Sequence, residues 1–156
     1  MGQSERFLKF IPFIFTAETV FKRGHYGDYD FVATEHDPND SGGTTRFGID
    51  EASHPNVDVE RLTKDGAQDI YFQEWTRDGI EGLPAIFGEC FFDCCVNAGL
   101  GRARRIRAKT GDDAGKFLDE REAFYRRLAA SVSKDRKFLK GWLNRVESLR
   151  RFLGIQ

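Results

Sequence analysis

The sequence predicts a mainly α-helical single domain with a small β-hairpin and loop lobe near the N-terminal third. Apolar residues recur at helical spacing through most of the chain beyond residue 59. Between residues 24 and 58 this pattern gives way to a segment rich in Gly, Asp, Asn and Thr, which is typical of turns and short strands. The 156 residues, 40% hydrophobic and 31% charged, are enough to bury the core of one soluble domain.

The first helix is expected to start after Ser4, because a serine side chain caps the free N–H groups of a first turn. Pro12 must either kink this helix or mark the first turn of a shorter one. Glu18 continues the apolar face, so its carboxyl group is expected to be at least partly desolvated. That face consists of Phe7, Phe10, Ile11, Ile14 and Phe15.

Two pieces of the polar segment favour β structure, residues 29–34 and residues 44–49, with turn residues between them. The rest of the chain is expected to be helical. Thr63 is a suitable cap for the helix that follows it, and Gly154 is suited to end the last one. The expected helices are residues 62–75, 84–99, 102–109, 113–132 and 138–153.

The two halves of the chain differ in charge. Residues 1–95 hold 8 Lys and Arg against 18 Asp and Glu, whereas residues 96–156 hold 16 against 7. We expect one domain over residues 1–156 whose basic C-terminal helices can meet an anionic membrane or lipopolysaccharide. The alternative is an ordinary solvated helical surface without a partner.

The three cysteines, Cys90, Cys94 and Cys95, are poorly spaced for a disulfide on one helix and contain no CxxC pair that would suggest zinc. Buried free thiols are expected, which implies synthesis in a reducing compartment. The apolar run at residues 10–15 is too short for a signal peptide and follows Lys9. The protein is therefore expected to be made in the cytoplasm without a signal peptide.

The segment EHDPNDSGGTTRFGID, residues 35–50, first suggests a calcium loop. With Asp37 at the first position of an EF-hand, Gly48 falls at the twelfth, where a bidentate glutamate is required. The sequence also has no phosphate loop, no dinucleotide-binding fingerprint and no HExxH motif. We therefore expect no metal, no cofactor and no nucleic-acid partner.

Hydrolysis of a glycosidic bond fits the same segment better. That reaction needs one carboxylic acid against apolar surface and a second group across the sugar. Glu18 suits the first role, and Asp37 and Asp40 suit the second. Thr44 or Thr45 can position a water, and Gly42 and Gly43 let the backbone approach a sugar ring. The alternative is a surface glutamate beside ordinary turn residues.

The stretch DPNDSGGTTRFGI resembles the D-P-x-D-P-G-G-x-T-x-x-G-I signature of glycoside hydrolase family 108, the lysozyme-like N-acetylmuramidases common among phage endolysins. LTKDGAQDIYFQEW is similar to the helix that follows this signature. LPAIFGECFFDCCVNAGLGRARRI is similar to the family's L-P…F-D-x-x-V-N-x-G segment, and REAFYRRLA and FLKGWLNRV are similar to its C-terminal helices.

The resemblance implies a lysozyme-like, mainly α fold and cleavage of the β-1,4 bond between N-acetylmuramic acid and N-acetylglucosamine in peptidoglycan. Glu18 occupies the place of the family's catalytic glutamate. Asp40, with Asp37 as the other candidate, corresponds to the signature aspartate, and Thr45 to the signature threonine. Asp93 and Asn97 match the F-D…N segment, where they either contact the substrate or tie neighbouring helices together.

The chain departs from the family after its glutamate, where Gly-Gly-Tyr is replaced by ETVFKRGHYGDYDF, and Ser41 replaces a proline. Glu35 lies nearer the loop than Glu18, but in a polar turn it is expected to be ionised, which is wrong for a general acid. We predict a monomeric phage endolysin that reaches the periplasmic cell wall after holin-type release. The alternative is a catalytically impaired module that binds peptidoglycan.

Overall fold

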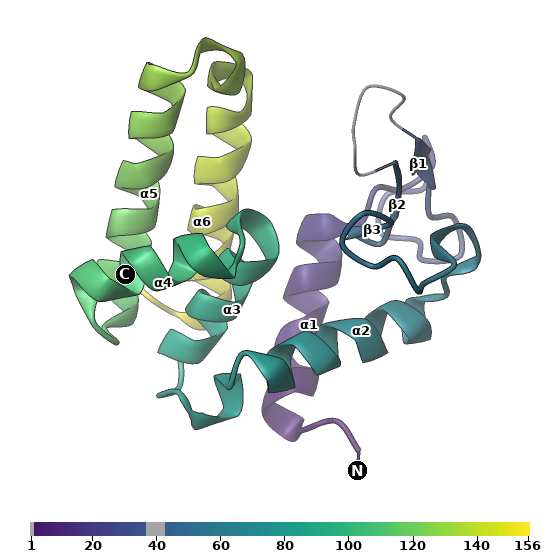
Figure 1. Ribbon diagram of the computed structural model, residues 1–156, viewed down its shortest axis with the longest axis horizontal. Coiled ribbons are helices and arrows are strands. Elements are labelled where there is room, and N and C mark those ends of the chain that lie inside the picture. The colour runs from purple at the N-terminus through teal and green to yellow at the C-terminus, as the bar shows by residue number, and fades with distance from the viewer. Residues whose placement is uncertain (1, 37–42) are drawn as a thin grey trace. The chain divides into compact units, whose positions relative to one another are not determined.

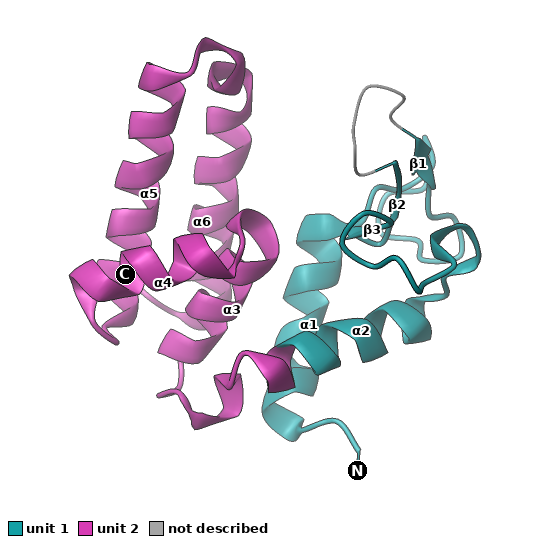
Figure 2. Ribbon diagram, viewed as in Figure 1, with its two compact units in different colours: residues 1–74 teal, residues 75–156 magenta. Residues whose placement is uncertain are grey.

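The computed structural model describes residues 2–36 and 43–156. Contacts divide the chain into two compact units, residues 1–74 and residues 75–156 (Figure 2). The boundary falls within helix α2 (Lys64–Arg77), whereas the change of charge along the sequence falls near residue 95.

Helix α1 (Glu5–Glu18) supplies much of the apolar core of the first unit. Ser4 caps it as predicted, with its hydroxyl accepting a hydrogen bond from the backbone N–H of Phe7 at 3.1 Å. The helix spans Pro12 as one element, so Pro12 does not begin a shorter helix. Buried side chains on both sides of the proline hold the helix in place: Phe7, Phe10, Ile11, Phe13, Ile14 and Phe15.

The small sheet contains three antiparallel strands in the order β1 (Glu35–His36), β2 (Thr44–Arg46) and β3 (Ile49–Asp50) (Figure 1). The β structure predicted at residues 44–49 is found, but as the hairpin of β2 and β3 in place of a single strand. The strand expected at residues 29–34 is wrong: this stretch forms successive turns and a single bridge between Phe21 and Val32. The turn-forming side chain of Asp28, which accepts a bond from the N–H of Asp30, outweighs the strand preference of the aromatic residues.

The second unit is helical, and all of its predicted helices are confirmed within a few residues. In the first unit Thr63 caps α2 through the N–H of Gly66, and in the second unit Asp113 caps α5 through the N–H of Lys116. Helices α5 and α6 run side by side and are joined by the 3-10 turn η3 (Ser133–Phe138) (Figure 1). The helices of this unit are α3 (Phe87–Ala98), α4 (Leu100–Thr110), α5 (Ala114–Ser131) and α6 (Leu139–Leu153), preceded by the 3-10 turn η2 (Ile80–Gly82).

A fully buried carboxylate joins three helices of the second unit. Asp93 of α3 is 0% exposed and accepts bonds from Arg121 of α5 at 2.7 Å and from Arg145 of α6 at 2.8 Å. Burial by itself raises the pKa of Asp93, but the attraction of Arg145 and Arg121 and their hydrogen bonds outweigh it and hold the pKa below 3.8. The carboxylate is therefore ionised inside the protein.

The cysteines are free, and Cys90 and Cys94 are buried, as predicted. Burial raises the pKa of the Cys90 thiol to about 12, so this side chain behaves as a small apolar residue. In the described part of the chain, no helix is long and apolar enough to cross a membrane.

Replacing Asp93 by asparagine is expected to lower the free energy of unfolding by about 3–5 kcal/mol, because the buried Arg121 and the largely covered Arg145 lose their counter-charge. Replacing Asp112, which pairs with Arg107 near the surface, is the matched control and is expected to cost no more than about 1 kcal/mol. Urea denaturation at neutral pH measures both values. Equal losses in the two variants would contradict a central role for Asp93.

The contribution of Asp93 to the free energy of unfolding also depends on pH. Because its pKa is lower in the folded protein than in the unfolded chain, its stabilisation is complete above the unfolded value of 3.8 and is lost as pH falls through the folded value. The stability difference between parent protein and Asp93→Asn is therefore expected to be constant above about pH 5 and to shrink at lower pH.

Candidate functional site

Glu18 is the last residue of α1 and is half-buried. The chain leaves the helix at Thr19, whose backbone N–H still donates to the carbonyl of Phe15. The buried ring of Phe15 packs edge-on against Tyr71 and Phe47 in the same unit. The predicted acid therefore sits at the end of an apolar helix face, as its position in the sequence suggested.

The turn of the hairpin lies directly against Glu18. Phe47 and Gly48 have φ angles of 54° and 78°, the left-handed pair of a two-residue hairpin turn. A β-carbon placed at Gly48 would lie 2.7 Å from Cβ and 3.1 Å from Oε2 of Glu18, and 2.6 Å from the hydroxyl of Tyr71. Only glycine allows this approach, and Tyr71 fixes it by donating to the carbonyl of Phe47 at 2.7 Å.

Thr45 lies in the middle strand of the sheet, three residues before Gly48. Its register partners are Glu35 on β1 and Asp50 on β3, so these three residues form one row across the sheet. Asp50 also accepts a bond from the N–H of Ser53 at 3.0 Å, which stabilises the loop that follows. Glu35 is exposed, in keeping with its rejection as the general acid.

Thr44 and Gly43 have structural partners. Thr44 is 7% exposed, and its hydroxyl lies 3.1 Å from Nδ1 of His36. A β-carbon at Gly43, which has a φ angle of 68°, would lie 2.9 Å from a carboxylate oxygen of Glu51. This glycine thus gives close approach to a side chain of the protein itself. The candidates Asp37, Asp40 and Gly42 lie outside the described residues.

Asp93 and Asn97 differ in position although they lie one turn apart on α3. Both oxygens of Asp93 are held by arginines and the residue is fully buried, so it ties helices together and does not face a substrate. This was the alternative left open by the sequence. Asn97 is half-buried and lines a pocket in the second unit.

Two basic residues of α6 form ion pairs with carboxylates inside the second unit. Arg145 holds Asp93, and Arg150 holds Asp119 at 2.7 Å and Glu122 at 3.2 Å. Phe138, at the start of this region, is 47% exposed, and Lys137 lies over its ring.

Part of this chain, including the hairpin, matches a known family. Residues 32–99 match the family described as Glycosyl hydrolase 108. Over these residues the chain is similar to glycosyl hydrolase family 108. The match includes Thr45, Gly48 and Asn97, whereas Glu18 precedes it.

A solved structure described as that of Brucella abortus SagA is similar over 96% of this chain and 95% of the other, with 24% sequence identity and a TM-score of 0.69. This likeness concerns the fold. The mainly helical architecture with a small three-stranded antiparallel sheet is consistent with the lysozyme-like fold that was predicted. No curated protein matches the sequence.

The match to this family over residues 32–99 supports a glycoside hydrolase that degrades peptidoglycan. Within the described residues, no group of three His, Cys, Asp or Glu side chains is placed to hold a metal ion. The site chemistry that these residues can supply is that of a carboxyl group and nearby hydroxyls.

Sequence reasoning missed the roles of Gly48 and Tyr71. Gly48 was considered as a missing calcium ligand and as the last glycine of the family signature, without a structural role. The Phe47-Gly48 pair is nevertheless compatible with a left-handed two-residue hairpin turn. The contact of Tyr71 with this turn joins residues 24 positions apart, which no local pattern reveals.

Replacing Gly48 by alanine is expected to cost about 2–4 kcal/mol of folding stability, because the new methyl group adds a steric clash with Glu18 and Tyr71 to an unfavourable φ angle. Gly24 has a similar φ angle of 85°, but a methyl group there would meet nothing within 4 Å, so Gly24→Ala is expected to cost only about 1 kcal/mol. Thermal unfolding of both variants separates steric clash from backbone strain. Equal losses would show that the close approach at Gly48 is unimportant.

Proposed function

We propose that this chain is an N-acetylmuramidase that cleaves the β-1,4 bond between N-acetylmuramic acid and N-acetylglucosamine in peptidoglycan. Glu18 donates a proton to the glycosidic oxygen as the bond breaks. The observation that supports this role is the close approach of the Gly48 turn to the Glu18 side chain. It joins a carboxyl group at the end of an apolar helix to the hairpin that carries the family signature.

The second catalytic group is proposed to be Asp40 or Asp37, acting with Thr45 to orient water or to stabilise the positively charged transition state. Thr45 is half-buried in the central strand, and the acidic residues of its row, Glu35 and Asp50, add negative potential beside it. This potential favours the oxocarbenium character that develops on the sugar during cleavage.

Replacing Glu18 by glutamine is expected to reduce the rate of peptidoglycan cleavage at least about 100-fold, because the amide cannot donate the proton. Release of reducing ends from purified peptidoglycan measures the rate. Borohydride reduction of the products should convert N-acetylmuramic acid, and not N-acetylglucosamine, into its alditol, which identifies the bond that is cleaved.

Glu5→Gln is the matched control, since Glu5 lies on the same helix but is exposed and paired with Lys9. It is expected to keep the parent rate. Full activity of Glu18→Gln would remove Glu18 from the mechanism. Sedimentation of the parent protein with peptidoglycan, without new reducing ends, would instead favour a binding module that lacks catalysis.

We also propose a biological role as a phage endolysin that is made in the host cytoplasm and reaches the periplasmic cell wall after holin-type release. Support comes from the resemblance of the signature region to the phage members of the family. The free, buried cysteines are compatible with synthesis in a reducing compartment.

Expression in the cytoplasm of a Gram-negative host tests this role. Cell turbidity is expected to stay constant until the inner membrane is permeabilised with chloroform and then to fall rapidly, because only then does the enzyme reach its substrate. The Glu18→Gln variant should leave turbidity unchanged after chloroform. Lysis that begins without permeabilisation would contradict the need for a holin.

A further inference from the structure

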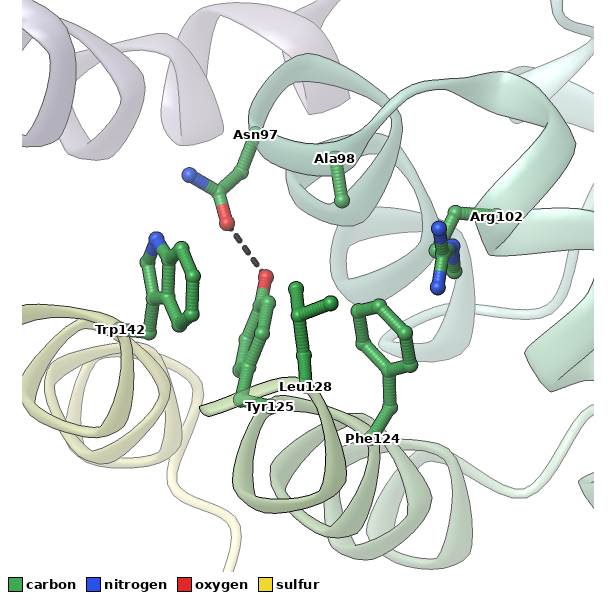
Figure 3. A pocket seen from close by; sticks show the side chains of 7 residues that line it. All are labelled: Asn97, Ala98, Arg102, Phe124, Tyr125, Leu128 and Trp142. Atoms are coloured by element: carbon green, nitrogen blue, oxygen red, sulfur yellow. Dashed lines mark hydrogen bonds between the residues drawn. The ribbon is translucent and has the colours of Figure 1, made fainter. Parts of the chain in front are cut away.

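A pocket of about 200 Å³ lies within the second unit, among its four helices (Figure 3). Aromatic side chains form much of its wall, and the rings of Tyr125 and Trp142 stack with their centroids 5.0 Å apart. Most of the lining residues are partly exposed, so the pocket is open to solvent. The lining residues are Asn97, Ala98, Arg102, Phe124, Tyr125, Leu128 and Trp142.

The buried charges fix the orientation of the Asn97 amide. Arg121 can only donate, and it donates to Oδ1 of Asn97 at 3.2 Å and, through Nε, to the hydroxyl of Tyr125 at 3.0 Å. The Tyr125 hydroxyl in turn donates to Oδ1 of Asn97. Because donors surround the carbonyl oxygen, the opposite end of the amide must be the NH₂ group. Figure 3 shows this nitrogen pointing away from Tyr125 and toward the side of Trp142.

Two further donors belong to the same pocket. The indole N–H of Trp142 can only donate, and in Figure 3 the ring nitrogen lies on the side of the indole that faces Asn97. The guanidinium of Arg102 lies 3.8 Å from the centre of the Phe124 ring, and its buried Nε has no hydrogen-bond partner in the described structure. The lining thus combines N–H donors with flat apolar surfaces and lacks a side chain that only accepts.

We propose that this pocket binds the carbonyl oxygen of a secondary amide of the substrate, with the amide's apolar flank against the aromatic wall. Asn97 and Trp142 donate to the oxygen, and the methyl or methylene group next to the carbonyl packs against the rings. In peptidoglycan such a group occurs in the N-acetyl substituents of the sugars and in the stem peptide. The choice of peptidoglycan as the polymer rests on the proposed function.

The pocket acts in substrate specificity. Its contacts with the substrate do not involve the proton donor, Glu18. A sugar without an acetamido group offers hydroxyls at the same place and has no apolar flank to cover the rings. The structure therefore predicts discrimination by the substituent on the sugar, through contacts that do not need Glu18. Binding can then be measured on a protein that cannot cleave.

NMR titration of the full-length Glu18→Gln protein tests the proposal. The chain has only two tryptophans, and Trp75 is 0% exposed, so Trp142→Phe identifies the indole N–H signal of the pocket. Tri-N-acetylchitotriose is expected to shift this signal and the Asn97 NH₂ signals. Cellotriose, which carries hydroxyls in place of the acetamido groups, is expected to bind at least about tenfold more weakly.

The dipeptide L-alanyl-D-isoglutamine distinguishes the two sources of the amide. If it shifts the Trp142 signal and chitotriose does not, the stem peptide is the ligand; the reverse result assigns the N-acetyl group. Failure of both ligands to shift the signal, or equal binding of cellotriose and chitotriose, would overturn the proposal. None of these outcomes depends on whether Glu18 is catalytic.

Asn97→Asp is the decisive variant. The aspartate can accept the same bonds from Arg121 and Tyr125, which preserves the helix contacts, but it replaces the NH₂ donors by an acceptor. Affinity for the amide ligand is expected to fall at least about tenfold. An unchanged Trp75 indole signal verifies the fold. Retained affinity in this variant would show that Asn97 does not bind the ligand.

Discussion

The absence of a side chain at Gly48 is the constraint on which the candidate site depends. With any β-carbon at this position, the turn of the hairpin would have to move away from Glu18 and from the hydroxyl of Tyr71. The left-handed backbone at Phe47 and Gly48 and the bond from Tyr71 to the Phe47 carbonyl act together. They bring a short sheet, which has little hydrogen bonding of its own, to a fixed position beside the end of α1.

The second unit is held together by a different interaction, a buried ion pair. Asp93 is taken fully out of water, at a cost that its two arginine partners must offset. One of these partners, Arg121, also donates hydrogen bonds to Tyr125 and Asn97. It thereby sets the direction of the bond between those two side chains. A buried ion pair is weak evidence for stability alone, but here it determines which atoms of an amide face the pocket.

Much of the helical framework could be predicted from the sequence, because long apolar periodicity and the capping residues Ser4, Thr63 and Asp113 agree with each other. The segment at residues 29–34 could not, since aromatic residues favour a strand while neighbouring Gly and Asp favour turns. The sequence also predicts Glu18 and Thr45 as site residues, and their roles stay a prediction. The partners of Asp93 lie 28 and 52 residues away, and the bond between Tyr71 and Phe47 depends on tertiary structure.

The ion pairs of Arg145 and Arg150 reduce the number of cations that the basic C-terminal half offers to a binding partner. Two of its cations are neutralised by neighbouring carboxylates within the same unit and release few counterions when a polyanion approaches. The formal excess of positive charge in residues 96–156 therefore overstates how many cations an anionic partner would meet. The exposed cations, such as Lys137 and Lys140, would set most of the salt dependence of binding to such a partner.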